Sequence, residues 1–308
     1  SILQIDQLNF TQPEFKVYLH DDSTRRKDIN SGMSGMFGDI ISAAAVKNFA
    51  IKDGDVTIYT TQPDTTFRGS VEQMNIIADN IRIDSIMSNF LIPFYVGNLD
   101  TKINGLLYQL GEYSTLDVAG LSFNSQRKDL LIEDASIRFD TTSIAISKTY
   151  PFQKDIISFS LKEMLVRGID MSNIYGAEMR LHANYILIDS LQLDDFRNKK
   201  LADPPNIEKP MFKAMLDHIN IPLDVDSILI RETAVSYTEM PENGEEPGTI
   251  SFNSINGHIG EISTDSLVQA ELESFQVQLN AKINNAAPLS FNLIVPYSDD
   301  YFYIEAIV

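Results

Sequence analysis

Apolar and polar residues alternate along most of this chain with a period of two, most clearly over residues 157–161 and 289–295. Successive side chains of a strand point to opposite faces, so the alternation indicates strands with one apolar and one polar face. Turn signals recur about every 8–12 residues, a spacing typical of antiparallel sheets. The same spacing predicts roughly 18–20 strands.

The pattern apolar-Asp-Ser-apolar occurs three times, at residues 83–86, 188–191 and 225–228. In a regular strand the two flanking apolar side chains would point to opposite faces. One extra residue, a β-bulge, would place both on one face. We therefore expect bulges in at least two of the three copies, with the Asp or Ser left unpaired.

The two halves of the chain match in order. Apolar residues spaced by three and four predict short helices near 39–48 and 209–219. Each predicted helix precedes a strand, tight turn and strand, at 51–59 and 230–237, whose second strands we expect to be equivalent. The match predicts two copies of one β-unit, residues 1–150 and 151–308, with the boundary near Pro151.

These patterns predict a mostly β protein built on an elongated, twisted, curved antiparallel sheet with two short helices. Two short helices are too few to cover the apolar face of so large a sheet. That face must either close on itself or stay open as a lined groove, and alternation fits both. A β-sandwich and a β-solenoid are the alternative folds.

Composition narrows the class of function. The net charge is −19, which disfavours binding to nucleic acid. Cysteine is absent, which excludes disulfides and thiolate sites. No stretch approaches the roughly 20 apolar residues of a membrane helix. The chain starts without Met and alternates up to Val308, so we expect it to be a piece of a longer protein.

No catalytic signature stands out, and we expect neither enzymatic activity nor a cofactor or metal. The four histidines (His20, His182, His218 and His258) lack the short spacing of metal ligands and are expected at the surface or in turns. The doublets Asp21-Asp22, Asp194-Asp195 and Asp299-Asp300 are expected to be solvated acids in turns.

One region resembles a known family. The residues that carry the resemblance are Ile169-Asp170, the helical pattern at Met211, Ile221-Pro222-Leu223-Asp224-Val225-Asp226-Ser227-Ile228, Tyr237, Pro247-Gly248-Thr249-Ile250-Ser251-Phe252 and Ile255-Asn256. This stretch looks like the AsmA-like proteins of Gram-negative bacteria, especially the long forms of Bacteroidetes. The likeness is strongest over about 166–262 and recurs more faintly over about 1–88.

The resemblance implies a function in lipid transport. AsmA-like proteins are similar to TamB and to the chorein-type bridge-like proteins, which are thought to carry phospholipids along apolar β-grooves between membranes. It implies a periplasmic segment of a protein that is anchored in the inner membrane by parts of the chain absent here. Its partners would be a phospholipid or other envelope lipid and envelope proteins, in lipid transport or outer-membrane assembly.

Two sets of residues are candidates for lipid contact. The apolar set, expected to line the groove, comprises Leu223, Val225, Ile228, Ile230, Leu289, Phe291, Leu293 and Val295. The basic set, expected to meet headgroup phosphates, comprises Arg25, Arg26, Lys27, Lys199 and Lys200. The alternative function is a non-enzymatic envelope scaffold or protein-interaction module, and a carbohydrate-active β-helix enzyme comes third.

Overall fold

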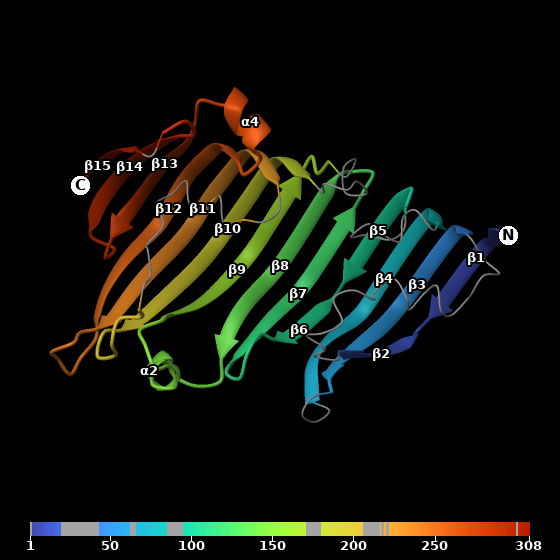
Figure 1. The fold of residues 1–308 in the computed structure, drawn as a ribbon, viewed down its shortest axis with the longest axis horizontal. Coiled ribbons are helices and arrows are strands. Elements are labelled where there is room, and N and C mark those ends of the chain that lie inside the picture. The colour runs from blue at the N-terminus through green and yellow to red at the C-terminus, as the bar shows by residue number, and fades with distance from the viewer. Residues whose placement is uncertain are drawn as a thin grey trace. The chain divides into compact units, whose positions relative to one another are not determined.

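The fold is dominated by strands, which account for 73% of the described residues of the computed structural model, alongside two short helices (Figure 1). The structure describes residues 2–19, 43–61, 66–84, 95–170, 180–205, 216, 219, 222–299 and 301–308. The predicted mostly β class is therefore confirmed. Within these residues, no helix has the length and apolar character needed to cross a bilayer.

The strands belong to one large mixed sheet of 15 strands. In chain order they are β1 (Ile2–Thr11), β2 (Glu14–Leu19), β3 (Ala43–Thr60), β4 (Thr66–Asp84), β5 (Asn98–Ile103), β6 (Gly105–Gln109), β7 (Ser114–Asn124), β8 (Asp129–Phe139), β9 (Asp155–Arg167), β10 (Leu181–Asn198), β11 (Leu223–Met240), β12 (Gly248–Ser263), β13 (Ser274–Ile283), β14 (Ala287–Pro296) and β15 (Tyr303–Ile307). The hydrogen-bonded order is β1-β3-β4-β5-β7-β8-β9-β10-β11-β12-β13-β14-β15. Off this path, β2 pairs with β3, and β6 pairs with β4 and β7.

The sheet is mixed, so the expectation of antiparallel pairing throughout was wrong. β1 and β2 both pair parallel with β3, and β10 pairs parallel with β11. Parallel neighbours need a connection that carries the chain back to the starting end of the first strand. Alternation within a strand does not reveal whether its neighbour runs parallel or antiparallel to it.

The helix predicted near 39–48 was wrong over its described residues, because Ala43 onwards form β3. Their backbone groups bond to β1, with Leu3 opposite Ala44 and Leu8 opposite Phe49. A short apolar run fits a helix or a buried strand equally well by periodicity, and here pairing decides the outcome. Most of the second predicted helix, near 209–219, lies outside the described residues, although Leu216 is helical.

Two other short helices were not predicted. Helix α2 (Ser143–Ser147) begins after Thr142, whose side chain accepts a hydrogen bond from the N–H of Ala145. Helix α4 (Ser266–Glu271) begins after Asp265, which caps the N–H of Leu267 in the same way. Such capping by Thr and Asp is a common start signal, but helices this short carry too few residues to show a period.

The tight turns expected inside 51–59 and 230–237 are absent, and β3 and β11 run through them as strands of 18 residues. Each strand instead contains one residue with left-handed backbone, Asp53 with φ 50° and Glu232 with φ 46°. The register shifts beside both residues, so the chain bulges without reversing. Strands of this length explain why the structure describes 15 strands rather than 18–20.

Packing contacts divide the chain into two compact units. Unit 1 comprises residues 1–108, 118–131 and 169–180, and unit 2 comprises residues 109–117, 132–168 and 181–308. The predicted repeat boundary near residue 150 stays a prediction, because these units are defined by contacts and not by repetition.

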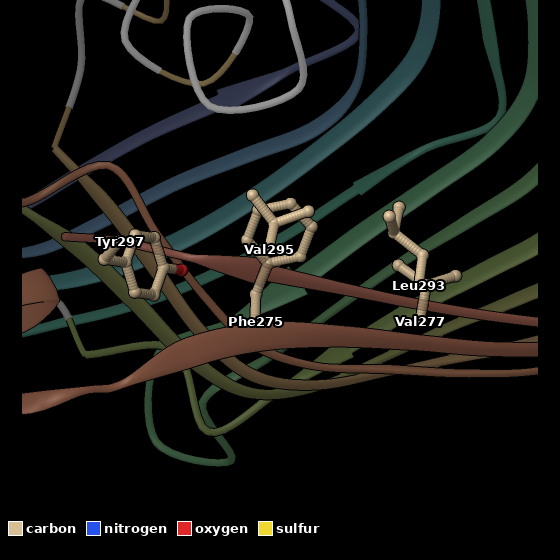
Figure 2. Packing of buried hydrophobic residues seen from close by; sticks show 5 residues of the cluster. All are labelled: Phe275, Val277, Leu293, Val295 and Tyr297. Atoms are coloured by element: carbon tan, nitrogen blue, oxygen red, sulfur yellow. The ribbon is translucent and has the colours of Figure 1, made fainter. Parts of the chain in front are cut away.

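Unit 2 contains two clusters of buried apolar residues. One consists of Phe275, Val277, Leu293, Val295 and Tyr297, which project from the same side of β13 and β14 (Figure 2). The other joins Ile146 of helix α2 to Ile156, Phe196 and Met240. The first cluster belongs to the face on which the candidate site is built.

Candidate functional site

The register of unit 2 aligns apolar side chains in rows that cross the strands. Residues paired in neighbouring strands lie on the same face of a sheet. One row crosses seven strands, β9 to β15, and each member is apolar: Val166, Ile186, Ile228, Ile259, Val277, Leu293 and Ile304. We call the side of unit 2 that bears this row the apolar face.

Two further rows lie on the apolar face. The second consists of Met164, Ile188, Ile230, Gly257, Leu279, Phe291 and Ala306. The third consists of Phe159, Leu193, Val235, Phe252, Ile283 and Ala287. Leu279 and Ile283 are four residues apart in β13, which has no left-handed residue among its described positions, so the second and third rows share a face.

Bulges in β10 to β12 keep these rows on one face. Ile188 and Leu193 are five apart, an odd separation that would put them on opposite faces of a regular strand. Ser190 between them has φ 54° and is skipped in the pairing of β10 with both neighbours. Ile188 and Leu191 consequently share the apolar face, as predicted for this Asp-Ser copy.

The copy at 225–228 also fulfils the bulge prediction. Asp226 is skipped in both pairings of β11, and Glu261 opposite it has φ 60°. Val225 pairs with Ile262 and Ile228 pairs with Ile259, and both partners pack against the Phe275 cluster. The copy at 83–86 lies half outside the described residues, which end at Asp84.

All eight predicted groove residues lie on the apolar face. Ile228 and Leu293 belong to the first row, and Ile230 and Phe291 belong to the second. Val225 is three residues from Ile228 and shares its face through the bulge at Asp226. The other three, Leu223, Leu289 and Val295, are two residues along their strands from Val225, Phe291 and Leu293. The pairing brings together residues that are up to 72 positions apart in sequence, from Leu223 to Val295.

Burial varies across the apolar face. Val225, Val295 and Leu293 are only 1%, 2% and 4% exposed, so this part of the face is a packed core. In contrast, Ile304 in β15 is 49% exposed and Ile157 in β9 is 48% exposed. The apolar face therefore combines a packed centre with exposed apolar side chains on β9 and β15, the first and last strands that the rows cross.

A charged group interrupts the apolar face two residues along the strands from the third row. There Asp195 pairs with Ile157 on one side and with Tyr237 on the other. The Oδ1 atom of Asp195 is buried without a hydrogen-bond partner. Burial raises the pKa of the Asp195 carboxyl, and the negative charge of Asp155 adds to the effect.

Ion pairs surround Asp195. The guanidinium of Arg197 donates two hydrogen bonds to Asp155, with an Nε–Oδ1 distance of 2.5 Å. The Tyr237 hydroxyl donates to Glu239, which also pairs with Lys199 at 2.7 Å. Burial and the bond to Glu239 raise the pKa of Tyr237 to about 12. Three carboxylates face two cations here, which leaves the group acidic.

The expectation for Asp194-Asp195 as solvated acids in a turn was wrong, because both residues lie inside β10. Adjacent strand residues point to opposite faces, and Asp194 accepts a hydrogen bond from Ser236 on the polar side. The sequence does hold one signal for Asp195. In unit 1, Val17 pairs with Ile58 as Asp195 pairs with Tyr237 in unit 2, so an acid stands where unit 1 has Val.

The basic candidates do not form a free patch in the described residues. Arg25, Arg26 and Lys27 lie outside them. Lys199 and Lys200 follow β10 and are exposed, but the ammonium of Lys199 pairs with Glu239. A headgroup phosphate would have to compete with this carboxylate for Lys199.

Unit 1 carries rows of the same kind. One crosses β1, β3, β4 and β5 with Leu8, Phe49, Ala78 and Leu99. Another crosses β2, β3, β4 and β6 with Phe15, Val56, Val71 and Leu106. Left-handed Asp53 and Gln73 lie between these rows, as Glu232 and Ser254 do in unit 2. The apolar rows and the bulges are thus repeated features of the chain.

Comparison with protein-family models, curated proteins and solved structures gives no significant match.

Proposed function

We propose that this chain is a segment of a periplasmic AsmA-like protein and that its apolar face shelters lipid acyl chains. The seven-strand apolar row of unit 2 carries the proposal, because an acyl chain needs unbroken apolar contact over its length. The role requires binding and passage alone, with no catalytic group. The proposed setting is lipid transport from inner to outer membrane, or outer-membrane assembly.

Transfer energies explain why a continuous row matters. Each buried CH₂ group is worth about 0.8 kcal/mol, so a 16-carbon chain costs on the order of 12 kcal/mol to expose to water. A polar interruption in the path would forfeit part of this energy. The first and third rows have no polar member, and Gly257 in the second removes a side chain without adding a polar group.

The exposed apolar side chains of β9 and β15, the first and last strands that the rows cross, are the proposed entry surface. Ile304 and Ile157 present apolar side chains to solvent, whereas Val225 and Val295 are already covered by protein. The acidic group around Asp195 would meet the polar part of a lipid, with Lys199 and Lys200 nearby in sequence. This arrangement leaves headgroups wet while the chains are sheltered.

The packed Phe275 cluster favours a second candidate function, a non-enzymatic scaffold whose apolar face is simply its core. The two functions differ in what an introduced charge does. A charge in a filled core unfolds the protein, whereas a charge beside an open lipid surface is solvated and displaces lipid.

Adjacent residues of β14 provide the matched test. Phe291 lies on the apolar face and its neighbour Asn292 on the opposite face, so Phe291→Asp and Asn292→Asp place the same charge on the two sides. We expect native mass spectrometry to detect phospholipid on the parent and on Asn292→Asp, and at least about tenfold less on Phe291→Asp, a loss of about 1.4 kcal/mol of binding. Melting temperatures control for folding.

Two results would contradict the proposal. The parent could carry no phospholipid even after incubation with phospholipid vesicles, or folded Phe291→Asp could bind as much lipid as Asn292→Asp. Because Phe291 lies beside the packed cluster, the exposed position Ile304→Asp repeats the test where unfolding is not expected. Loss of folding in both apolar-face variants would favour the scaffold.

A further inference from the structure

Four polar side chains form a network at the beginning of the parallel pair β10–β11, on the face opposite the apolar face. His182 pairs directly with Asp224 across the two strands, and Asn184 and Asp226 lie two residues further along. The alternate positions Ala183 and Val225 are buried, at 5% and 1% exposure. The side chains of His182 and Asp224 are about one third and one quarter exposed, so solvent ions can reach the network.

The two ring nitrogens of His182 make contacts of different kinds. Nδ1 lies 2.8 Å from Oδ2 of Asp224, a hydrogen-bond distance that is too short for two ligands of one metal ion. In the tautomer in which Nδ1 donates to Asp224, Nε2 carries the free lone pair. A carboxylate that fixes the ring in this way is the usual partner of a metal-ligating histidine.

Nε2 of His182 faces Oδ2 of Asp226 at 3.9 Å. That separation is too long for a hydrogen bond, but two ligands each about 2.0–2.2 Å from one Zn²⁺ ion lie roughly 3–4 Å apart. His182, Asp224 and Asp226 offer ligand atoms that all lie within 4.8 Å of one another. Imidazole nitrogen together with carboxylate oxygen suits Zn²⁺ and similar transition metals, and disfavours Mg²⁺ and Ca²⁺.

Asn184 bridges the two facing acceptors. Its Nδ2 atom lies 2.8 Å from Oδ2 of Asp226 and 3.3 Å from Nε2 of His182. The amide nitrogen thus stands between two lone pairs, where a cation would be attracted.

Gly168 provides the room for Asn184. It follows β9 with φ 69°, and a Cβ atom there would lie 1.9 Å from Oδ1 of Asn184. A side chain at position 168 would therefore expel the amide from the network. The glycine shows that the network depends on a third segment of unit 2 besides the two paired strands.

From these contacts we propose a divalent transition-metal site of the Zn²⁺ class, with Nε2 of His182 and Oδ2 of Asp226 as protein ligands. Asp224 positions the His182 ring, and water completes the tetrahedral shell. The bound ion would join β10 to β11 at the start of their parallel pairing. The proposal is independent of lipid binding.

Calorimetric titration of the chelator-treated 308-residue chain with Zn²⁺ tests the site. We expect one ion per chain in the parent and loss of this binding in His182→Gln and Asp226→Asn. Asp224→Asn should weaken affinity by about 10–100-fold, because it removes the partner that orients the ring. His258→Gln is the matched control, since His258 lies on the polar face of neighbouring β12, and it should bind Zn²⁺ as the parent does.

Absence of saturable binding in the parent would overturn the proposal, as would parent-like binding in folded His182→Gln or equal loss in His258→Gln. Co²⁺ provides a measurement on the parent alone, independent of whether variants fold. A tetrahedral site should give intense visible absorption bands that Zn²⁺ abolishes by competition. A spectrum of hexaaqua Co²⁺ would contradict the site.

Discussion

The side chain of Asn256 accepts a 3.1 Å hydrogen bond at Oδ1 from the backbone N–H of Glu232, the left-handed residue inside β11. Its Nδ2 atom donates to the carbonyl of Ser254, another left-handed residue, at 3.0 Å. In unit 1, Asn75 accepts from the N–H of Asp53 at 3.1 Å in the same manner. One asparagine thus fixes the bulge in each copy of the hairpin.

Replacing this asparagine should destabilise the protein. We expect Asn256→Ala to lower the free energy of unfolding by about 1–2 kcal/mol, because the N–H of Glu232 loses its acceptor. The control is Asn292→Ala, whose hydrogen bond to Glu305 is exposed and 3.4 Å long, and which should change stability by less than about 0.5 kcal/mol. Urea denaturation measures both, and equal losses would show that Asn256 is not special to the bulge.

The left-handed conformation of Ser190 predicts opposite effects for two substitutions. Glycine adopts φ 54° without strain, so Ser190→Gly should be neutral or stabilise by up to about 1 kcal/mol. A β-branched residue is strained there, so Ser190→Val should destabilise by about 1–2 kcal/mol. Ser160→Val, at an exposed position of neighbouring β9, serves as the control. Thermal unfolding in which Ser190→Val matched Ser160→Val would argue against the bulge.

The Tyr297 hydroxyl forms hydrogen bonds with the backbone at the bulge of Glu261. Its hydroxyl donates to the carbonyl of Glu261 at 2.6 Å and accepts from the N–H of Ser263 at 2.8 Å. Tyr297→Phe should cost about 1–3 kcal/mol, because buried backbone groups lose their partners. Tyr113→Phe is a control, since it removes a tyrosine hydroxyl away from this bulge. A loss no larger than that of the control would contradict the role of Tyr297.

Alkaline unfolding provides a second measurement on Tyr297. Burial raises its pKa to about 12, above the ordinary value of 10.0. The folded state therefore holds the phenol proton more tightly than the unfolded state does. Its contribution is complete below about pH 10 and is lost as the pH rises towards about 12. The stability of Tyr297→Phe should fall less steeply over this interval than that of the parent.

Asp195 should make the protein less stable at neutral pH than Val would at the same position. Its pKa is raised in the folded state, so its favourable contribution is present below the pKa of the unfolded chain and is lost as the pH rises through the folded value. We expect Asp195→Val to raise the free energy of unfolding at about pH 7 by about 1 kcal/mol, the cost of one unmade hydrogen bond. The difference should shrink below about pH 4, where the carboxyl is protonated in both states.

Neighbouring Asp194 supplies the control for this change. Asp194→Val removes the same charge from the polar face, where Asp194 accepts a hydrogen bond from Ser236, and it should give no stabilisation at neutral pH. Chemical denaturation at several pH values compares the two variants. A pH-independent effect of Asp195→Val would mean that the carboxylate is adequately solvated.

Local rules predicted much of this fold. Alternation at Leu289 to Val295 correctly placed a strand with one apolar face. The Asn284-Asn285 doublet, with φ 49° and 57°, forms the turn between β13 and β14. The three-residue spacing of Ile188 and Leu191 correctly revealed a bulge, because two apolar residues cannot otherwise share a face at that distance.

What escaped prediction depends on contacts between distant segments. The parallel pairing of Ala44 with Leu3 cannot be read from a local period, so a strand was mistaken for a helix. His182 and Asp224 are 42 residues apart and meet only through the register of β10 and β11. Asp195 was misjudged because its strand continues where the acidic doublet suggested a turn.

The length of the first apolar row follows from the spacing of its strands. Neighbouring strands lie about 4.8 Å apart, so a row across seven strands measures roughly 29 Å along its path, close to the roughly 30 Å hydrocarbon thickness of a bilayer. Its seven side chains are Ile, Val or Leu, which differ little in size and in affinity for water. Displacement by one strand therefore exchanges each contact for one of the same kind. Such a surface allows an acyl chain to shift along the row and offers it no position of markedly stronger binding.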